Sequence, residues 1–281
     1  MNDTVALDLP SLSKCAEESY ARLRQSIAAA GPMIVGFSGG SDSALLLKVA
    51  AEVLTGRVLA VTAVSPSLAQ SELDDARAIA AEVGVRHLLV DSQEMEVEGY
   101  RENSPRRCYF CKSELFRILK DAARREGFAA IAYGAITDDL GDFRPGMEAA
   151  REAGAIAPLL EAGISKDHVR EISRHLGLRT WDKPQSACLS SRVPFGTRIE
   201  VAVLSRIEQA EAALRSEGLR QVRVRDHGEI ARVECPQDEF DRLLDPARRK
   251  RIVIALQAAG FRFVCLDLAG YRSGSLNPPT S

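Results

Sequence analysis

The sequence predicts an α/β protein with a parallel sheet, followed by a smaller C-terminal α+β domain. Three observations support this. From residue 33 to about residue 180, short apolar runs alternate with amphipathic helical patterns, which is typical of a parallel sheet covered on both faces. A glycine-rich turn follows the first apolar run, and after residue 197 the order of elements changes. We therefore predict domains at residues 1–196 and 197–274 and a disordered tail at residues 275–281.

The first domain should contain four strands that alternate with helices. The predicted strands are 33–37, 57–64, 87–90 and 129–133, and the predicted helices are 42–54, 71–83 and 112–126. Because parallel strands end at one edge of a sheet, the loops after Phe37, Val64, Val90 and Tyr133 should form one crevice. A further helix is expected from the N-cap Ser165 to residue 176, where Gly177 ends it.

Residues 181–198 show little periodicity and read as a long functional loop. The second domain should begin with a helix over residues 199–217. Strands are expected at residues 221–225 and 229–234, joined by a turn at His227 and Gly228. A basic helix up to residue 259 and a strand at residues 261–268 complete the prediction.

The amino-acid composition limits the classes of function that this protein can have. The 281 residues are 46% hydrophobic and 27% charged, as in an ordinary soluble protein. Lysine and arginine number 37 against 39 acidic residues, so the net charge of −2 leaves no overall basic footprint and makes a nucleic-acid partner unlikely. We expect a cytoplasmic protein without a membrane anchor, because neither a signal sequence nor a run of about 20 apolar residues is present. Six cysteines then argue for metal binding, catalysis or burial rather than disulfides.

The string Ser38-Gly39-Gly40-Ser41-Asp42-Ser43 reads as a pyrophosphate-binding turn. Paired glycines allow close approach of an anion to the backbone, and the helix that follows presents free N–H groups and its positive dipole end. The string differs from GxxxxGK[ST] and from GxGxxG. It resembles the SGGxDS signature of the PP-loop ATP pyrophosphatases. We predict that Ser38, Gly39, Gly40, Asp42 and Ser43 bind nucleotide.

The pair Cys108 and Cys111 forms a CxxC element after Arg106 and Arg107. Two thiols at this spacing can hold a metal, form a redox pair or lie at a helix start by accident. Structural zinc requires four ligands, and the sequence has no second CxxC or CxxH that would supply them.

Cys188 lies in the predicted loop between Lys183 and Arg192, whose positive charges would favour the thiolate form. A thiolate is a competent nucleophile toward an activated acyl group. For Cys15, Cys235 and Cys265 we expect burial in small gaps, as is common for free cysteines.

Several unusual strings together resemble one family, the LarE sulfur-insertion enzymes of nickel-pincer nucleotide biosynthesis. The resemblance covers nearly the whole chain. The strings are GFSGGSDSALLLKVA, RCYFCKSELF, YGAITDDLGDFRPG, KPQSACLSSRVPFGTRI, RVRDHGEIARVE and LDLAGYRSGSLN. The family implies a PP-loop domain of the adenine nucleotide alpha-hydrolase-like type, with a smaller domain after it.

The resemblance implies a two-step reaction. ATP first adenylylates a carboxylate of a nicotinate-derived mononucleotide, pyridinium-3,5-biscarboxylic acid mononucleotide, and sulfur then displaces AMP. Mg²⁺ would bind oxygen ligands near Asp42 and offset the charge of the triphosphate. Arg192, Arg223 and Arg225 would bind the phosphate and the second carboxylate of the substrate. Members of this family form homo-oligomers.

The family supplies sulfur in two ways. In one, the cysteine matching Cys188 gives up its own sulfur and becomes dehydroalanine. In the other, three cysteines hold a [4Fe-4S] cluster that carries an exogenous sulfide. Because this sequence has Cys108, Cys111 and Cys188, we predict the cluster form, with Cys188 as the catalytic residue.

Other readings remain open at this stage. The residues Asp138, Asp139, Asp142 and Arg144 either contact nucleotide or magnesium or form a solvated turn. Arg223 and Arg225 share one face of a strand, and an exposed basic face is their alternative role. A tRNA thiolation enzyme also joins a PP-loop to three cysteines, but it would be expected to carry a basic surface or an added RNA-binding module. A nucleotide-binding sensor would have no use for a reactive Cys188.

Overall fold

The computed structural model describes residues 11–141, 145–184 and 186–272, and the chain divides into two compact units. Unit 1 comprises the chain up to Val64 together with Gln70–Ser92 and Cys108–Ser186. Unit 2 comprises Ser65–Ala69, Gln93–Arg107 and the chain from Ala187 onward. The domain limits at residues 196 and 197 stay predictions; unit 2 begins ten residues earlier and includes two segments from the first half of the chain. The tail at residues 275–281 lies outside the described residues.

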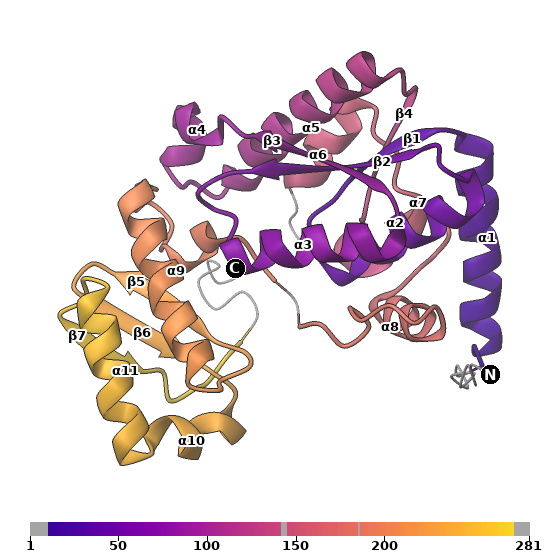
Figure 1. The fold of residues 1–281 in the computed structure, drawn as a ribbon. Helices are drawn as coiled ribbons and strands as arrows, with labels where there is room; N and C mark the ends of the chain where they lie inside the picture. Colours follow the sequence, from indigo (N-terminus) through magenta and orange to yellow (C-terminus); the bar gives the residue numbers. More distant parts are fainter. Residues whose placement is uncertain (1–10, 142–144, 185, 273–281) are drawn as a thin grey trace. The chain divides into compact units, whose positions relative to one another are not determined.

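Unit 1 is built on a four-stranded parallel sheet in the order β3-β2-β1-β4 (Figure 1). The strands are β1 (Met33–Gly36), β2 (Val58–Val64), β3 (Arg86–Asp91) and β4 (Ala130–Tyr133). This confirms the predicted α/β class and the four predicted strands. Since β1 lies between β2 and β4, the chain leaves it in one direction and later returns on its other side. That switch point is where open α/β sheets bind ligands.

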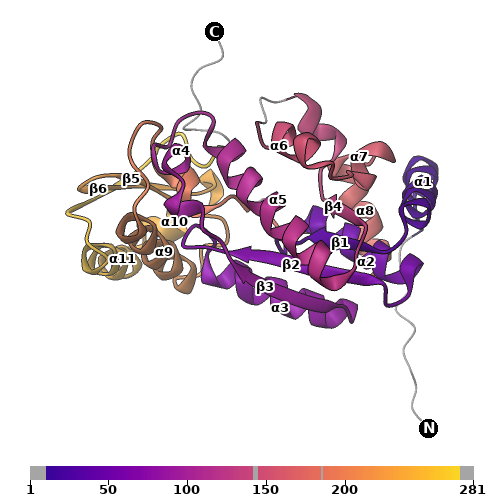
Figure 2. The same cartoon turned by 90° about the horizontal axis from the view of Figure 1, so that it is seen from above.

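Helices cover both faces of this sheet, and Figure 2 shows α3 and α5 on opposite sides. Met33 and Val35 of β1 belong to the cluster formed with α1, α2, α3 and α8, whereas Ile34 belongs to the cluster formed with α5 and α6. Alternate residues of each strand therefore enter separate cores. The helices of unit 1 are α1 (Lys14–Ala30), α2 (Ser41–Leu54), α3 (Gln70–Val83), α5 (Arg107–Glu126), α6 (Pro145–Ala153), α7 (Pro158–Glu161) and α8 (Lys166–His175), with the 3₁₀ turn η2 (Thr137–Gly141).

Two helix starts differ in how well the sequence predicted them. Ser165 caps α8 as expected, since its hydroxyl accepts a hydrogen bond from the backbone N–H of His168 at 3.3 Å. By contrast, α5 begins at Arg107 and not at residue 112. The prediction was wrong because it placed the CxxC element before the helix, whereas both cysteines lie within its first five residues. The sequence analysis also proposed no helix before Met33, where α1 lies.

Unit 2 contains a three-stranded mixed sheet in the order β5-β6-β7. β5 and β6 are antiparallel and joined at Gly228, whose φ of 71° suits glycine in a tight turn; β6 and β7 are parallel. One face of the sheet packs on α9 and α11 in a second core. The elements are η1 (Glu94–Glu96), α4 (Glu98–Arg101), η3 (Leu189–Arg192), α9 (Val201–Ser216), β5 (Arg223–His227), β6 (Ile230–Glu234), η4 (Gln237–Glu239), α10 (Phe240–Leu244), α11 (Pro246–Ala258) and β7 (Phe263–Leu266).

No helix in the described part of the chain combines the length and the apolar character that crossing a membrane requires.

Candidate functional site

The predicted pyrophosphate-binding turn lies in unit 1 between β1 and α2. Gly39 has a φ of 71°, and a Cβ added there would lie 3.0 Å from the backbone of Ala76. Glycine is therefore required both by conformation and by space. Gly40 is the N-cap of α2 and provides no side chain to cap the first N–H groups of the helix. This helix start is suited to hold an anion.

Two serines of the predicted set close the turn on itself. The hydroxyl of Ser43 accepts a hydrogen bond from the backbone N–H of Ser38 at 3.3 Å and donates to the carbonyl of Gly40 at 3.1 Å. The two hydroxyl oxygens lie 3.2 Å apart. The turn thus has a defined shape before any phosphate contacts it.

Gly134, which the sequence analysis did not single out, lies against the start of α2. A Cβ at this position would be 3.0 Å from the backbone nitrogen of Ser43 and 3.1 Å from its Cα. Gly134 directly follows β4, the strand beside β1. The close approach therefore joins the loop after β4 to the turn after β1 at the switch point of the sheet. Its sequence signal is a glycine one residue after a predicted strand.

Lys166 is a second residue that the sequence analysis missed. Its Nζ lies 2.7 Å from Oδ1 of Asp42 and donates to the hydroxyl of Ser41 at 2.8 Å. Lys166 is the first residue of α8 and directly follows the predicted N-cap Ser165. That cap was the sequence signal that could have drawn attention to Lys166. The ammonium group brings a positive charge to the start of α2, where phosphate oxygens would bind.

The described acidic residues after β4 accept hydrogen bonds from backbone N–H groups. Asp138 accepts one from Lys166, and Asp139 accepts one from Ile136, both at 3.0 Å. The contact of Asp139 favours the turn-forming role, whereas that of Asp138 joins the loop after β4 to the start of α8. The other two residues of the predicted group, Asp142 and Arg144, lie outside the described residues.

Lys183 contacts the glycine turn and two carboxylates of unit 1. Its Nζ lies 2.8 Å from carboxylate oxygens of both Glu72 and Asp75 and donates to the carbonyl of Gly39 at 3.2 Å. These contacts hold the turn. That the charge of Lys183 also favours the thiolate of Cys188 stays a prediction.

Cys188 lies in unit 2, at the residue that precedes η3, and its side chain is exposed. The residues that follow it are buried: Leu189 donates its N–H to the carbonyl of Ser67 at 2.8 Å, and the hydroxyl of Ser190 is hydrogen-bonded to that of Tyr100. Burial, together with the negative charges of Glu94 and a Cys188 thiolate, raises the pKa of Tyr100. The exposed Cys188 is thus followed directly by two buried residues.

The three predicted substrate-binding arginines are buried, so the alternative of an exposed basic strand face is wrong. Arg192 and Arg225 are 2% and 5% exposed, and each pairs with a fully buried glutamate. Arg192 contacts both carboxylate oxygens of Glu211, at 2.8 and 3.0 Å, and Arg225 contacts Oε2 of Glu234 at 2.7 Å. Burial raises the pKa of Glu211, but the charges of Arg192 and Arg215 outweigh it and keep that pKa low.

Arg223 is 7% exposed and has a different environment from the other two. Its guanidinium lies over the ring of Tyr271, 5.4 Å from the ring centroid, and donates to the carbonyl of Val222 at 2.8 Å. Burial and the neighbouring charge of Arg192 lower the pKa of Arg223. An anion bound beside it would offset both effects.

The six cysteines divide by burial and by unit. Cys108 is exposed and Cys111 is half-buried, and their spacing of three residues in α5 places them on one helix face. Cys235 is buried as expected, and its burial raises the pKa of its thiol to about 11. Cys15 and Cys265 are exposed, so the expectation of burial was wrong for these two. Cys108 and Cys111 count with unit 1, and Cys188 counts with unit 2.

Across residues 11–141, 145–184 and 186–272, no group of three or more His, Cys, Asp or Glu side chains is arranged to hold a metal ion. The three thiols predicted to bind iron come from both units, and thiolates are chemically suitable ligands for iron–sulfur clusters.

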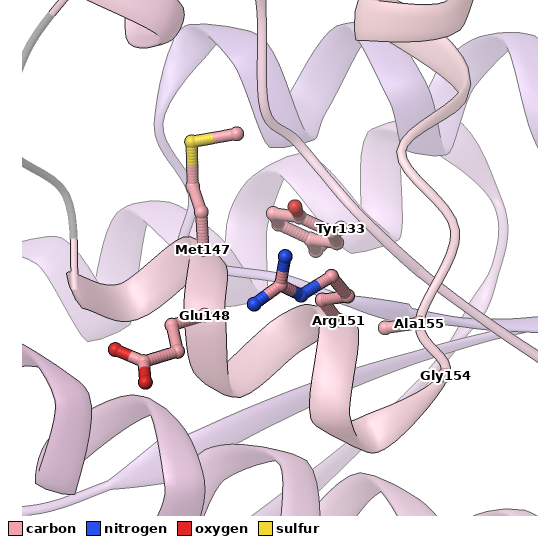
Figure 3. Close-up of a pocket in the computed structure, with 6 residues that line it drawn as sticks. All are labelled: Tyr133, Met147, Glu148, Arg151, Gly154 and Ala155. Atoms are coloured by element: carbon pink, nitrogen blue, oxygen red, sulfur yellow. The ribbon is translucent and has the colours of Figure 1, made fainter.

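Unit 1 also contains a pocket of about 590 Å³ that none of the predicted residues lines. It opens at the end of β4, where Tyr133, Arg151 and Glu148 belong to its wall (Figure 3). Burial, with the charges of Asp139 and Glu161, raises the pKa of Tyr133. A smaller pocket of about 210 Å³ includes Lys183 in its lining and so lies beside the turn.

Comparison with known proteins provides an independent test of the sequence-based resemblance. Residues 16–108 match the NAD synthase family model. An uncharacterized protein of Synechocystis sp., slr1717, is 45% identical over 261 residues, which cover 93% of this chain and 97% of the relative. The uncharacterized protein MJ0830 of Methanocaldococcus jannaschii is 27% identical over 241 residues, 86% of this chain and 91% of that protein.

A named relative is found in Lactiplantibacillus plantarum. Its pyridinium-3,5-bisthiocarboxylic acid mononucleotide synthase is 40% identical over 245 residues, which cover 86% of this chain and 88% of the relative. Together with the parallel sheet and its glycine turn, this match shows that the chain belongs to the LarE family of PP-loop proteins.

Proposed function

We propose that this protein is an ATP-dependent sulfurtransferase. It adenylylates a carboxylate of pyridinium-3,5-biscarboxylic acid mononucleotide and replaces the AMP group with sulfur to give a thiocarboxylate. One observation carries the proposal: a glycine turn at the start of α2 and an exposed Cys188 occur in a chain that is 40% identical to a synthase of the corresponding bisthiocarboxylic acid mononucleotide.

The first step is supported by the geometry of unit 1. A substrate carboxylate oxygen attacks the α-phosphorus of ATP, an acyl–AMP anhydride forms, and pyrophosphate leaves. The start of α2 and its glycine turn hold the departing pyrophosphate oxygens, and Nζ of Lys166, 2.7 Å from Asp42, can turn toward them. The anhydride makes AMP a good leaving group, whereas a free carboxylate oxygen would be a poor one.

Mg²⁺ is the metal that this step would use, and the carboxylate of Asp42 is a suitable oxygen ligand for it. Asp42 lies in the first turn of α2, next to the predicted phosphate position. When bound, Mg²⁺ would neutralise charge on the triphosphate. Lys166 and Asp42, which contact each other, would then each gain a second partner. The ammonium group of Lys166 would contact phosphate, and the carboxylate of Asp42 would bind the metal.

For the second step we propose that a sulfur atom held at Cys188 attacks the acyl carbon of the acyl–AMP anhydride. AMP then leaves with the electrons of the broken C–O bond. In the cluster form, Cys108, Cys111 and Cys188 would supply the thiolate ligands of a [4Fe-4S] cluster. When bound, that cluster would carry a sulfide for repeated turnover. In this form the ligands would come from both units, Cys108 and Cys111 from unit 1 and Cys188 from unit 2.

The alternative second step uses Cys188 alone. Its thiolate displaces AMP, and loss of the Cα proton then breaks the Cβ–S bond, leaving a thiocarboxylate on the product and dehydroalanine in the protein. The exposure of the Cys188 side chain is compatible with both forms. The cysteine pair in α5 favours the cluster form.

The phosphate and second carboxylate of the mononucleotide would bind near the three predicted arginines. We propose that Arg223 makes the direct contact, because its guanidinium lies over the ring of Tyr271 and an anion beside it would offset the neighbouring charge of Arg192. Arg192 and Arg225 would contribute positive charge without contacting the substrate directly, since both are paired with buried glutamates.

Three further expectations stay predictions: a homo-oligomeric state, a cytoplasmic location and the absence of a nucleic-acid partner. The last is supported by the net charge of −2, which gives no general attraction to a phosphate backbone. A tRNA thiolation enzyme is the alternative that the assay below would detect.

The purified protein, incubated with ATP, Mg²⁺ and the biscarboxylated mononucleotide, should release pyrophosphate and yield a product about 16 Da heavier, as sulfur replaces oxygen. Mass spectrometry and a pyrophosphate assay check both. Pyrophosphate release that requires tRNA in place of the mononucleotide would assign the protein to tRNA thiolation. Nucleotide binding without pyrophosphate release would make it a sensor.

Asp42→Ala should lower the rate of pyrophosphate release by about 100-fold or more, because it removes the metal's carboxylate ligand at the phosphate site. Asp74→Ala is the matched control: this aspartate lies on α3, is exposed and pairs with Arg77. The control should stay within about twofold of the wild type. Equal rates for the two variants would remove Asp42 from the mechanism.

Cys188→Ala should leave pyrophosphate release within about threefold of the wild type while thiocarboxylate formation is lost, because only the second step needs the thiol. Cys265→Ala, an exposed cysteine of the same unit, is the control and should form product normally. Thiocarboxylate formation by the Cys188 variant would refute the proposed mechanism.

Anaerobic reconstitution should load about four iron and four sulfide ions per chain, and Cys108→Ala should lose them. Cys15→Ala, at an exposed cysteine of α1, should load normally. Elemental analysis and the visible absorption spectrum measure both. A mass loss of about 34 Da at Cys188 after turnover, without bound iron, would instead establish the sacrificial form.

A further inference from the structure

The backbone around Cys188 is held by arginine side chains from three separate parts of unit 2. Each of these arginines uses its Nη1 atom to donate to one or two carbonyls in a run of five residues, 187–191, here called the Cys188 segment. The contacts are Arg192 to the carbonyls of Ala187 at 2.6 Å and Cys188 at 3.0 Å, Arg107 to that of Ser190 at 3.0 Å, and Arg225 to that of Ser191 at 2.8 Å.

Each of the three arginines is also held by a second side chain. Arg192 and Arg225 rest on the buried carboxylates of Glu211 and Glu234, and Arg107, which is 6% exposed, donates to the side-chain oxygen of Asn103. A buried guanidinium can leave its partners only at a large cost in desolvation. The Cys188 segment therefore rests on donors that cannot easily move away.

Asn103 extends this support beyond the segment. It is fully buried and has a φ of 53°, a left-handed conformation that is uncommon outside glycine. Its side-chain nitrogen donates to the carbonyls of Pro194 at 2.8 Å and Thr197 at 2.9 Å, while its oxygen accepts from Arg107. One asparagine and one arginine, four residues apart, thus contact both the Cys188 segment and the chain that follows it.

Arg107 has a further contact that holds its orientation. Its guanidinium lies over the ring of Phe195, 5.5 Å from the ring centroid. It is also the first residue of α5, directly before Cys108. Arg107 therefore has two positions at once. It begins the helix that carries the CxxC pair, and it holds the backbone of the Cys188 segment.

We propose that Arg107 is a positioning residue for Cys188. It fixes the backbone from which the exposed thiol projects, so that sulfur meets the acyl carbon in a productive geometry. Misplacement of a reacting group by about 1 Å can lower a rate 100-fold, so such support has a kinetic role without any contact to substrate. This role rests on the proposed function of Cys188, and it differs from substrate binding, which would act on affinity.

The test compares Arg107→Met and Arg107→Lys with Arg106→Met, a change at the exposed neighbouring arginine. Three quantities are measured on the full chain: amide hydrogen exchange of residues 186–196, the rate of pyrophosphate release, and single-turnover thiocarboxylate formation as a function of mononucleotide concentration. For the Met variant we expect exchange at Leu189, Ser191 and Val193, whose amides are hydrogen-bonded, to be at least about tenfold faster.

The Met variant should also lower the maximal rate of thiocarboxylate formation at least about tenfold. The half-saturating mononucleotide concentration and the rate of pyrophosphate release should stay within about twofold of the wild type. Arg107→Lys keeps the positive charge but loses the planar guanidinium group. It should recover part of the maximal rate of thiocarboxylate formation. If the Met variant does not fold, the Lys variant tests the same directions with smaller effects.

Three outcomes would overturn the proposal. These are unchanged exchange in the Cys188 segment, identical behaviour of the Arg107 and Arg106 variants, and a tenfold rise in half-saturating concentration with an unchanged maximal rate. The last would make Arg107 a substrate ligand. If the wild type makes no thiocarboxylate at all, the proposed function fails instead, and the exchange data still decide whether Arg107 holds the segment.

Discussion

Buried guanidinium groups need hydrogen-bond acceptors, and in unit 2 this need connects elements that are far apart in the sequence. Glu211 of α9 accepts from Arg192, from Arg215 and from the backbone N–H of Val224 in β5. The remaining donors of Arg192 point to the Cys188 backbone. One fully buried carboxylate therefore ties a helix, a strand and the reactive loop together. Removal of either partner would leave an uncompensated charge in the interior.

Unit 1 uses its cations in another way. Lys166 and Lys183 both contact the glycine turn or its first helical residues, and both are partly exposed and end in a flexible stem. In unit 2 the planar guanidinium groups are buried and make several fixed contacts each. The cations beside the glycine turn are thus partly exposed ammonium groups, whereas those beside Cys188 are buried guanidinium groups.

Local patterns were enough to predict the parallel strands, the glycine turn and the Ser165 cap, because each depends on periodicity or on one residue's conformational preference. The start of α5 was predicted too late, since nothing local to the CxxC pair marks Arg107 as helical. Lys166 escaped notice because its partner, Asp42, lies 124 residues away. The burial of Arg223 and Arg225 likewise depends on distant glutamates and on helix packing, which a two-residue spacing on a strand cannot reveal.

The path of the chain has a consequence for how such a protein can be divided. The backbone passes from one compact unit to the other after Val64, Ala69, Ser92, Arg107 and Ser186. A cut after Ser186 separates two segments of unit 2 from the rest of that unit, and a cut at any of the other four points divides unit 1. No single cut therefore yields two self-contained units. Gene fusion or truncation would be a poor route to new specificities on this scaffold, and variation has to enter by substitution within an undivided chain.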